Sequence, residues 1–186
     1  MNKEKNDRII LGIDPGTNIM GYGIIQQKSN KLSLLELDVL KLNNLQDHPE
    51  KLKKIFITIL DLIDKYKPQI IAIEAPFFGK NVQSMLKLGR AQGVAIAAAV
   101  YRDVPVFEYS PRKIKQSITG RGAASKEQVA EMLVRLLQMK EIPKHLDATD
   151  AVAVAVCHYF QKDTSITNEK YSGWEAFIRK NPGRLE

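Results

Sequence analysis

Four acidic side chains stand at positions from which they could bind a divalent cation. Asp14 and Glu74 each follow a run of apolar residues that is typical of a buried strand, and Asp147 and Asp150 open a helix-like segment. A spacing of three puts the last two carboxylates on the same side of a helix. Crowded carboxylates repel one another, so a folded chain tolerates them mainly when a cation lies between them or when one keeps its proton. The sequence therefore predicts a metal site, provided that the strand ends and the helix meet.

Each acidic position also has a simpler explanation. Asp14-Pro-Gly-Thr17 consists of residues that favour turns, and the Gly-Ile-Asp-x-Gly-Thr pattern around it resembles the first phosphate loop of actin-like ATPases and sugar kinases. Asp147 could cap its helix with Asp150 in the first turn, where carboxylates are favourable. Glu74 is harder to explain in this way, because an acid after an all-apolar strand must be paired, cap a helix or bind a cation.

The composition fits one globular domain. The chain has 186 residues, of which 44% are hydrophobic, and about 150 residues is a usual domain size. We expect a single domain over residues 1–160 and a polar tail over residues 161–186. No stretch approaches the roughly 20 apolar residues of a membrane span, and the charged start lacks the apolar core of a signal peptide. We therefore expect a cytoplasmic protein with no membrane contact, in which Cys157 is a small buried side chain within an Ala and Val run.

The excess positive charge is concentrated in one segment. The whole chain carries a net charge of +7, and residues 80–126 contain nine Lys and Arg against two acidic residues. The parts before and after this segment nearly cancel, at +1 and −1. Basic residues beside an acidic metal site fit a polyanion held near the metal, because phosphate neutralisation dominates nucleic-acid affinity. A solvated basic face is the simpler alternative.

Hydrophobic spacing assigns these residues to strands and helices. Ser125 and Gln128 form a capping box at the start of one helix. Three strands come first and later strands alternate with helices, so we expect an α/β fold with a mixed sheet and helices on both faces. The predicted strands are residues 8–13, 19–27, 32–40, 69–73 and 104–108, and the predicted helices are residues 47–66, 82–101, 111–118, 125–139 and 146–160.

Five sequence blocks carry a more specific signal, and the ordered similarity to which they belong covers roughly residues 8–160. They are Asp14-Pro-Gly-Thr-Asn-Ile-Met-Gly-Tyr-Gly-Ile24, Ile73-Glu-Ala-Pro-Phe-Phe-Gly-Lys-Asn81, Leu86-Lys-Leu-Gly-Arg-Ala-Gln-Gly-Val-Ala95, Pro105-Val-Phe-Glu-Tyr109 and Asp147-Ala-Thr-Asp-Ala151. In this order they resemble the RuvC family of bacterial Holliday-junction resolvases. Five ordered blocks are far more specific than any one of them.

The resemblance implies an RNase H-like fold with a mixed five-stranded sheet, a homodimer and magnesium-dependent cleavage of two opposed strands of a four-way DNA junction. Asp14, Glu74, Asp147 and Asp150 match the acidic tetrad of the family. Two Mg²⁺ ions about 4 Å apart would hold the scissile phosphate, activate the attacking water and stabilise the leaving 3′ oxygen. Asp14 would bridge them, and which of Asp147 and Asp150 binds metal directly stays open. Mn²⁺ is expected to substitute, and the branch-migration complex of RuvA and RuvB is the implied protein partner.

The same resemblance suggests how DNA would be bound. Phe77 matches the wedge aromatic of the family, although Phe78 follows it here and either ring could insert between bases. Lys115 and Lys126 match basic positions near the catalytic face, and Arg121 lies on a loop between two glycines. The helix start at residues 80–84 offers backbone amides to a phosphate. The predicted DNA-binding residues are Phe77, Phe78, Lys80, Asn81, Ser84, Arg112, Lys115, Arg121 and Lys126.

The predicted helix at residues 82–101 carries a stripe of apolar and small residues that permits close approach of another helix. A buried core helix would explain the stripe about as well, and the resemblance favours a dimer interface whose two-fold axis aims two sites at two strands. The predicted interface residues are Met85, Leu88, Gly89, Gln92, Gly93 and Ile96.

Two other classes of function, and one alternative within the nuclease class, fit part of this pattern. An actin-like ATPase or sugar kinase would need a second phosphate loop and an adenosine-binding half, and the chain is too short for both. A metal-free junction-binding module would keep the basic segment and tolerate the loss of Glu74. A shorter RNase H-like family proposed to process ribosomal RNA precursors shares the opening Asp-Pro-Gly pattern, but the segment around Phe77 and the helix with Lys87-Leu-Gly-Arg-Ala91 favour the resolvase.

Overall fold

The computed structural model describes residues 7–29, 31–76, 81–141, 143 and 146–161. One five-stranded mixed sheet organises this part of the chain, with the strand order β3-β2-β1-β4-β5. The first three strands form an antiparallel meander, and β4 and β5 run parallel to β1. The elements are β1 (Arg8–Asp14), β2 (Ile19–Lys28), β3 (Lys31–Lys41), α1 (His48–Tyr66), β4 (Ile70–Glu74), α2 (Val82–Tyr101), β5 (Val106–Tyr109), α3 (Pro111–Thr119), α4 (Lys126–Leu136) and α5 (Leu146–Phe160).

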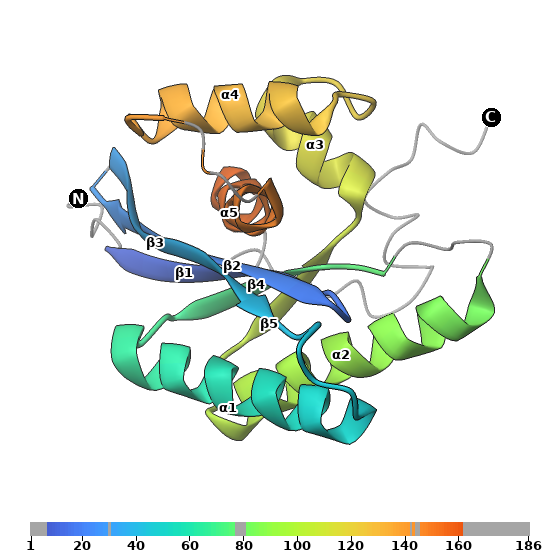
Figure 1. Cartoon of the computed structure of the whole chain (residues 1–186). Coiled ribbons are helices and arrows are strands. Elements are labelled where there is room, and N and C mark those ends of the chain that lie inside the picture. The colour runs from blue at the N-terminus through green and yellow to red at the C-terminus, as the bar shows by residue number, and fades with distance from the viewer. Residues whose placement is uncertain (1–6, 30, 77–80, 142, 144–145, 162–186) are drawn as a thin grey trace, which may run out of the picture.

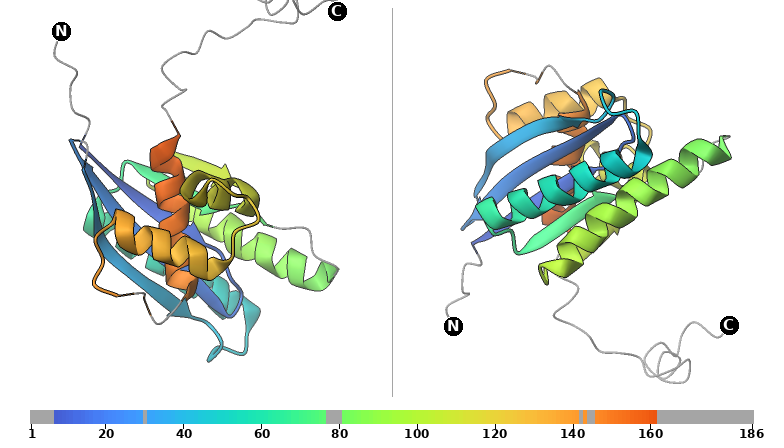
Figure 2. Two further views of the ribbon diagram at one scale, coloured as in Figure 1. Left: turned by 90° about the horizontal axis from the view of Figure 1, so that it is seen from above. Right: turned by 60° about the horizontal axis from the view of Figure 1, so that its bottom comes forward.

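Helices cover both faces of the sheet, as predicted. Figure 1 shows α1 and α2 against one face, and α5 against the other with α3 and α4 stacked outside it. The two further views in Figure 2 show α5 lying across the strands beneath α4. Each face has its own hydrophobic core, built around Leu11 and Ile73 on the side of α1 and α2, and around Ile10 and Ala72 on the side of α5. Because β1 and β4 are covered on both faces, they consist of near-continuous apolar runs.

Strand glycines let α5 lie very close to the sheet. A Cβ atom added at Gly21 would lie 2.0 Å from the carbonyl oxygen of Asp147, and one added at Gly12 would lie 2.0 Å from that of Ala151. The facing side of α5 is lined by small residues, and Ala148 and Ala151 are buried there. Any larger residue would push the two elements apart. The glycines therefore set how far the first turn of α5 stands from the ends of β1 and β2.

Most predicted boundaries agree with the structure to within one or two residues. The prediction for α4 was too long, because the helix ends at Leu136 rather than Met139. Gln138 adopts a left-handed backbone conformation with φ of 52°, which ends the helical path. The strand β5 begins at Val106 rather than at Val104. The capping box of Ser125 and Gln128 is confirmed at the start of α4.

Apart from its first residue, the expected tail lies outside the described residues, whereas the helices named above and Cys157 lie within them. The division into a domain at 1–160 and a tail at 161–186 stays a prediction, because residues 162–186 lie outside the described part. Across the described helices, none combines the length and apolar character needed to cross a bilayer. Cys157 is buried, as expected from its surroundings.

Candidate active site

The carboxyl ends of two adjacent parallel strands bring the first two acids together. Asp14 ends β1 and Glu74 ends β4, and the residues before them, Ile13 and Ile73, are register partners. The third element is α5, whose first turns carry Asp147 and Asp150. The sequence could predict each of these placements separately, but only the parallel pairing of β1 with β4 puts the two strand ends at one edge.

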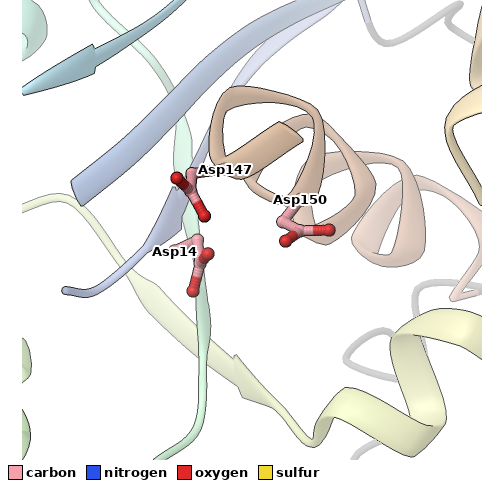
Figure 3. Close-up of side chains that lie close together, drawn as sticks. All are labelled: Asp14, Asp147 and Asp150. Atoms are coloured by element: carbon pink, nitrogen blue, oxygen red, sulfur yellow. The ribbon is translucent and has the colours of Figure 1, made fainter. Parts of the chain in front are cut away.

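Three of the four predicted acids converge closely. One carboxylate oxygen from each of Asp14, Asp147 and Asp150 can be chosen so that all lie within 4.8 Å of one another. Figure 3 shows Asp14 and Asp147 facing each other, with Asp150 one turn further along α5. Glu74 lies outside this group of three, but it lines a cavity of about 230 Å³ together with Asp14 and Asp150. The structure thus brings all four acids to one edge of the sheet, three of them within mutual reach of a single ion.

The electrostatics of the site favour a bound cation. Burial raises the pKa of Asp14 to about 8, and the neighbouring charges of Glu74 and Asp150 act in the same direction. Burial also raises the pKa of Glu74 to about 7, with Asp150 as the main charged contributor. The pKa of Asp150 is raised as well by burial, against the opposing effect of Lys126. Without a cation these carboxyls hold their protons at a pH where ordinary carboxyls are ionised.

Lys126 forms an ion pair with one of the four acids. Its ammonium group donates a hydrogen bond of 2.5 Å to Oδ2 of Asp150. Partial burial opposes the charged form, yet this hydrogen bond and the charge of Asp150 raise the pKa of Lys126 above its ordinary value. Lys115 lines the same cavity, and two ammonium groups cannot neutralise four carboxylates. The donor set is all oxygen and carries excess negative charge, which fits hard divalent cations such as Mg²⁺.

A basic groove continues from the acidic cavity. Pro111 and Lys115 line both the cavity and an open groove of about 670 Å³, whose other basic residues are Arg112 and Arg121. The start of α3 forms the wall between them, and its amide at Lys113 is already capped by the Ser110 hydroxyl. Four of the predicted DNA-binding residues, Arg112, Lys115, Arg121 and Lys126, therefore lie along one path that leads to the acids.

The remaining predicted DNA-binding residues are placed less completely. Asn81 caps α2, and its side-chain oxygen accepts a hydrogen bond from the backbone amide of Ser84. The amide of Ser84 is therefore already occupied within the chain, while both side chains are exposed. Phe77, Phe78 and Lys80 lie outside the described residues, so their role stays a prediction.

The exposed face of α2 differs in part from the predicted stripe. At Gly89 and Gly93 an added Cβ would meet nothing within 4 Å in the described part of the chain. Leu88, by contrast, lines a small cavity of about 90 Å³ beside Asp14 and Glu74, and Gln92 is only 6% exposed. Met85 and Ile96 are partly buried. The assignment of all six residues to an interface stays a prediction.

Sequence reasoning missed two features of α2. Val82, Leu86 and Val100 are apolar and 52 to 64% exposed, and together with Gly89 and Gly93 they are spaced by four, three, four and seven residues, which places them on one face of the helix, as in a helix-packing seam. Their spacing in the sequence was the available signal. The second feature is the contact of Gln92 with Glu108 on β5, for which the sequence contains no local signal.

Known proteins are similar to this chain in sequence and in fold. The family model described as "Crossover junction endodeoxyribonuclease RuvC" matches residues 10–158. The curated relative of that description from Cytophaga hutchinsonii is 61% identical over 180 residues, covering 97% of this chain and 89% of the relative. The one from Christiangramia forsetii is 56% identical, covering 97% and 94%. The solved structure of Thermus thermophilus RuvC in complex with a Holliday junction substrate has a TM-score of 0.74 and 31% identity, covering 82% of this chain and 93% of its own. The family model and these relatives match most of the chain. This chain therefore belongs to the RuvC family of crossover junction endodeoxyribonucleases.

Proposed function

We propose that this chain is a magnesium-dependent endonuclease that resolves four-way DNA junctions by paired nicks in two opposed strands. The observation that carries the proposal is the convergence of carboxylate oxygens from Asp14, Asp147 and Asp150 within 4.8 Å, next to Glu74 and at the mouth of a basic groove. Family membership supplies the substrate class. The acid cluster and the groove supply the means to hold a divalent cation and a phosphate backbone side by side.

The four acids would hold two Mg²⁺ ions. Asp14 is placed to bridge them, since it neighbours both Glu74 on the adjacent strand and the two acids of α5. Mg²⁺ bound there would lower the pKa of the attacking water and stabilise the leaving 3′ oxygen. The chain itself would orient the phosphate between the acids and the basic groove. Mn²⁺ is proposed to substitute, because the donor set is all oxygen.

The basic groove would carry the strand away from the cut. Arg112 and Arg121 line it on the side remote from the acids, while Lys115 is shared with the acidic cavity. Gly122 makes room for the Arg112 side chain, because an added Cβ there would lie 2.6 Å from its Cγ. Phe77 or Phe78 is proposed to wedge between bases at the crossover, on family resemblance.

A homodimer would make the two nicks symmetric. The seam of Val82, Leu86, Gly89, Gly93 and Val100 is uncovered within the described chain. A helix-interior glycine costs roughly 0.5–1 kcal/mol relative to alanine, and among the described residues nothing would obstruct a Cβ at either position. Close approach of a second copy of α2 explains both the glycines and the exposed apolar residues. Met85, Leu88 and Ile96 would flank this contact.

The test of dimerisation is sedimentation velocity on Leu86→Glu. A charge in the middle of a symmetric contact faces its own copy, so the variant is expected to sediment as a monomer, to bind one junction arm and to lose paired nicking. Lys53→Glu on α1 is the control for an added exposed acid. A dimer that survives Leu86→Glu unchanged would contradict the proposed interface.

Two further assignments follow from the family alone. The RuvA and RuvB branch-migration complex is the proposed protein partner, to be checked by co-sedimentation of this chain with junction DNA and that complex. The cytoplasm is the proposed location, because a chromosomal junction is the proposed substrate and the relatives named above are bacterial.

The experiment that tests the function is cleavage of a synthetic mobile four-way junction, with linear duplex and an RNA hairpin as competitors. Wild type is expected to make paired nicks that yield ligatable duplexes in Mg²⁺ and none in EDTA. Glu74→Gln is expected to bind the junction and not to cut it. Glu131→Gln, an exposed acid on α4, is the matched control.

Three outcomes would contradict the proposal. Tight junction binding without incision in any metal would leave a recognition module. Preferred cleavage of the RNA hairpin would point to the RNA-processing relatives of the fold. Full activity of Glu74→Gln would exclude the four-acid site.

A further inference from the structure

Gln92 is one of three buried polar or charged side chains in the described part of the chain, with Thr149 and His158. It lies on α2 and is 6% exposed. A buried amide needs hydrogen-bond partners, because an unmade bond there costs the desolvation of the group. Its Nε2 has two: Oε2 of Glu108 at 2.7 Å and the backbone carbonyl oxygen of Glu74 at 3.5 Å.

The two contacts differ in strength and have different consequences. The bond to Glu108 is short and made to a carboxylate, so it fixes the orientation of the amide. The contact to Glu74 is long and weak by itself. Glu108 on β5 thus aims the second N–H of Gln92 at the last carbonyl of β4, and the network joins three elements at the end of one strand.

The peptide group after Glu74 is therefore held from both sides. The carbonyl of Glu74 faces Gln92, and the amide of Ala75 donates to the carbonyl of Tyr109 at 2.9 Å. A peptide group is planar, so holding its oxygen and its nitrogen fixes the rotation of the strand end. That rotation sets the direction of the Glu74 Cα–Cβ bond, while its carboxylate lines the acidic cavity on the side of α5.

We propose that Gln92, oriented by Glu108, is a positioning residue that holds the end of β4 so that the Glu74 carboxylate meets the other three acids. The inference rests on the proposed function and deepens it. Gln92 lines the small cavity that contacts Asp14 and Glu74 from the α2 side, and it reaches the backbone of Glu74 rather than its carboxylate. It therefore acts through Glu74 and does not touch the reacting atoms.

The test replaces the amide without leaving a void. Gln92→Met keeps a side chain of similar length and removes both donors. Glu108→Leu removes the acceptor that orients the amide. Supporting interactions of metal ligands typically contribute 10- to 100-fold in metal affinity or activity, so each variant is expected to weaken Mn²⁺ binding by about 10-fold. Binding is measured on the full chain without DNA, by the electron paramagnetic resonance signal of free Mn²⁺.

Cleavage assays add a second readout that a purely structural role would not move. The Mg²⁺ concentration for half-maximal nicking is expected to rise by about 10-fold, with the junction dissociation constant unchanged. Glu108→Gln retains an acceptor and is expected to lose less than Glu108→Leu. The double variant is expected to be no worse than either single one, because the two residues act as a unit. Gln83→Met, an exposed position on the same helix, is the matched control.

The outcomes below separate failure of the positioning role of Gln92 from failure of the proposed function. Mn²⁺ binding within about two-fold of wild type in both Gln92→Met and Glu108→Leu overturns the proposal. If Gln92→Met does not fold, Glu108→Leu carries the test, because Glu108 is exposed. If wild type binds Mn²⁺ but cuts no junction, the proposed function fails, whereas weaker Mn²⁺ binding in the variants still supports the positioning role of Gln92.

Discussion

Asp14 shows at the scale of one residue how function opposes stability. Its carboxyl is buried beside Glu74 and Asp150, which raises its pKa to about 8. An unfolded carboxyl has a pKa near 3.8, so the folded chain binds this proton more tightly than the unfolded chain does. The resulting stabilisation is full below about pH 4 and is lost as the pH rises through about 8. Ionising the carboxyls of the metal-free site therefore lowers the stability of the fold, and a bound cation would offset this electrostatic cost.

The first prediction concerns the removal of this charge. Asp14→Asn is expected to stabilise the metal-free protein at pH 8 by about 1 kcal/mol, since active-site residues are often replaced at a gain in stability, and to lower cleavage by at least about 100-fold. At pH 4 the gain should vanish, because the native carboxyl is then protonated. Urea denaturation at both pH values measures this, with exposed Asp61→Asn on α1 as the control. A loss of stability at pH 8 would mean that the carboxylate is not strained.

The second prediction concerns protons released by the metal. Metal ligands must be deprotonated, and the pKa values of Asp14 and Glu74 are raised to about 8 and about 7. Mg²⁺ binding at pH 7 is therefore expected to release one or two protons, and the affinity should rise by up to about tenfold per pH unit for each proton released between pH 6 and 8. Calorimetry in two buffers of different ionisation enthalpy counts these protons. Binding without proton release would show that the carboxyls are already ionised.

At the scale of elements, the site depends on how closely α5 approaches the sheet. Gly21 lies on β2 against the backbone of Asp147, and Gly12 lies on β1 against Ala151. Backbone contact with these glycines therefore sets the position of the first turns of α5, and the ion pair of Asp150 with Lys126 holds one of the side chains. Gly93 on α2 is the opposite case, because an added Cβ there would meet none of the described residues within 4 Å.

The third prediction compares these two kinds of glycine. Gly21→Ala is expected to destabilise the chain by about 1–3 kcal/mol, the usual cost of overpacking, and to weaken Mg²⁺ binding because it moves Asp147. Gly93→Ala is expected to stabilise the isolated monomer by about 0.5–1 kcal/mol and to weaken the dimer. Urea denaturation at low protein concentration and sedimentation at high concentration measure the two effects. Equal effects of both substitutions on monomer stability would contradict this account.

At the scale of the whole molecule, acidic and basic surfaces meet at one place. Residues 80–126 contain the entire excess of positive charge, and the fold places three of its basic residues in the groove and Lys126 in the adjoining acidic cavity. The α1 side, on the other face of the sheet, lies away from this path. The charge distribution thus favours binding of a polyanion in the groove that leads to the acidic cavity.

The fourth prediction is a salt dependence. Arg112→Ala and Arg121→Ala are each expected to weaken junction binding and to lower the slope of log affinity against log salt by about one, the value for one lost phosphate contact. The cleavage rate at saturating protein should change less, because neither side chain lines the acidic cavity. Lys53→Ala on α1 is the control. Unchanged salt slopes in both arginine variants would place the DNA elsewhere.

The sequence predicted the elements well because each is determined by local chemistry. Ser125 and Gln128 cap α4 through neighbouring groups, and the buried strands are read from their apolar runs. Asp14 and Glu74 were recognisable as candidate site residues, because a carboxylate at the end of a buried strand must be paired, hydrogen-bonded or bound to a cation. The early end of α4 was not predicted, because a residue other than glycine that adopts a left-handed conformation, here Gln138, leaves little signal in the sequence.

What the sequence by itself determined is the inventory of the molecule: the elements, the four acids and the basic segment, all of which depend on residue type and spacing. Only the tertiary structure decided which residues face one another. The pairing of β1 with β4, the approach of α5 over Gly12 and Gly21, and the contact of Gln92 with Glu108 and Glu74 all join residues far apart in the chain. Such contacts are set by the packing of whole elements, so no local pattern encodes them. Exposure is decided in the same way, because an apolar residue such as Leu86 has the same spacing whether its helix face is buried or open.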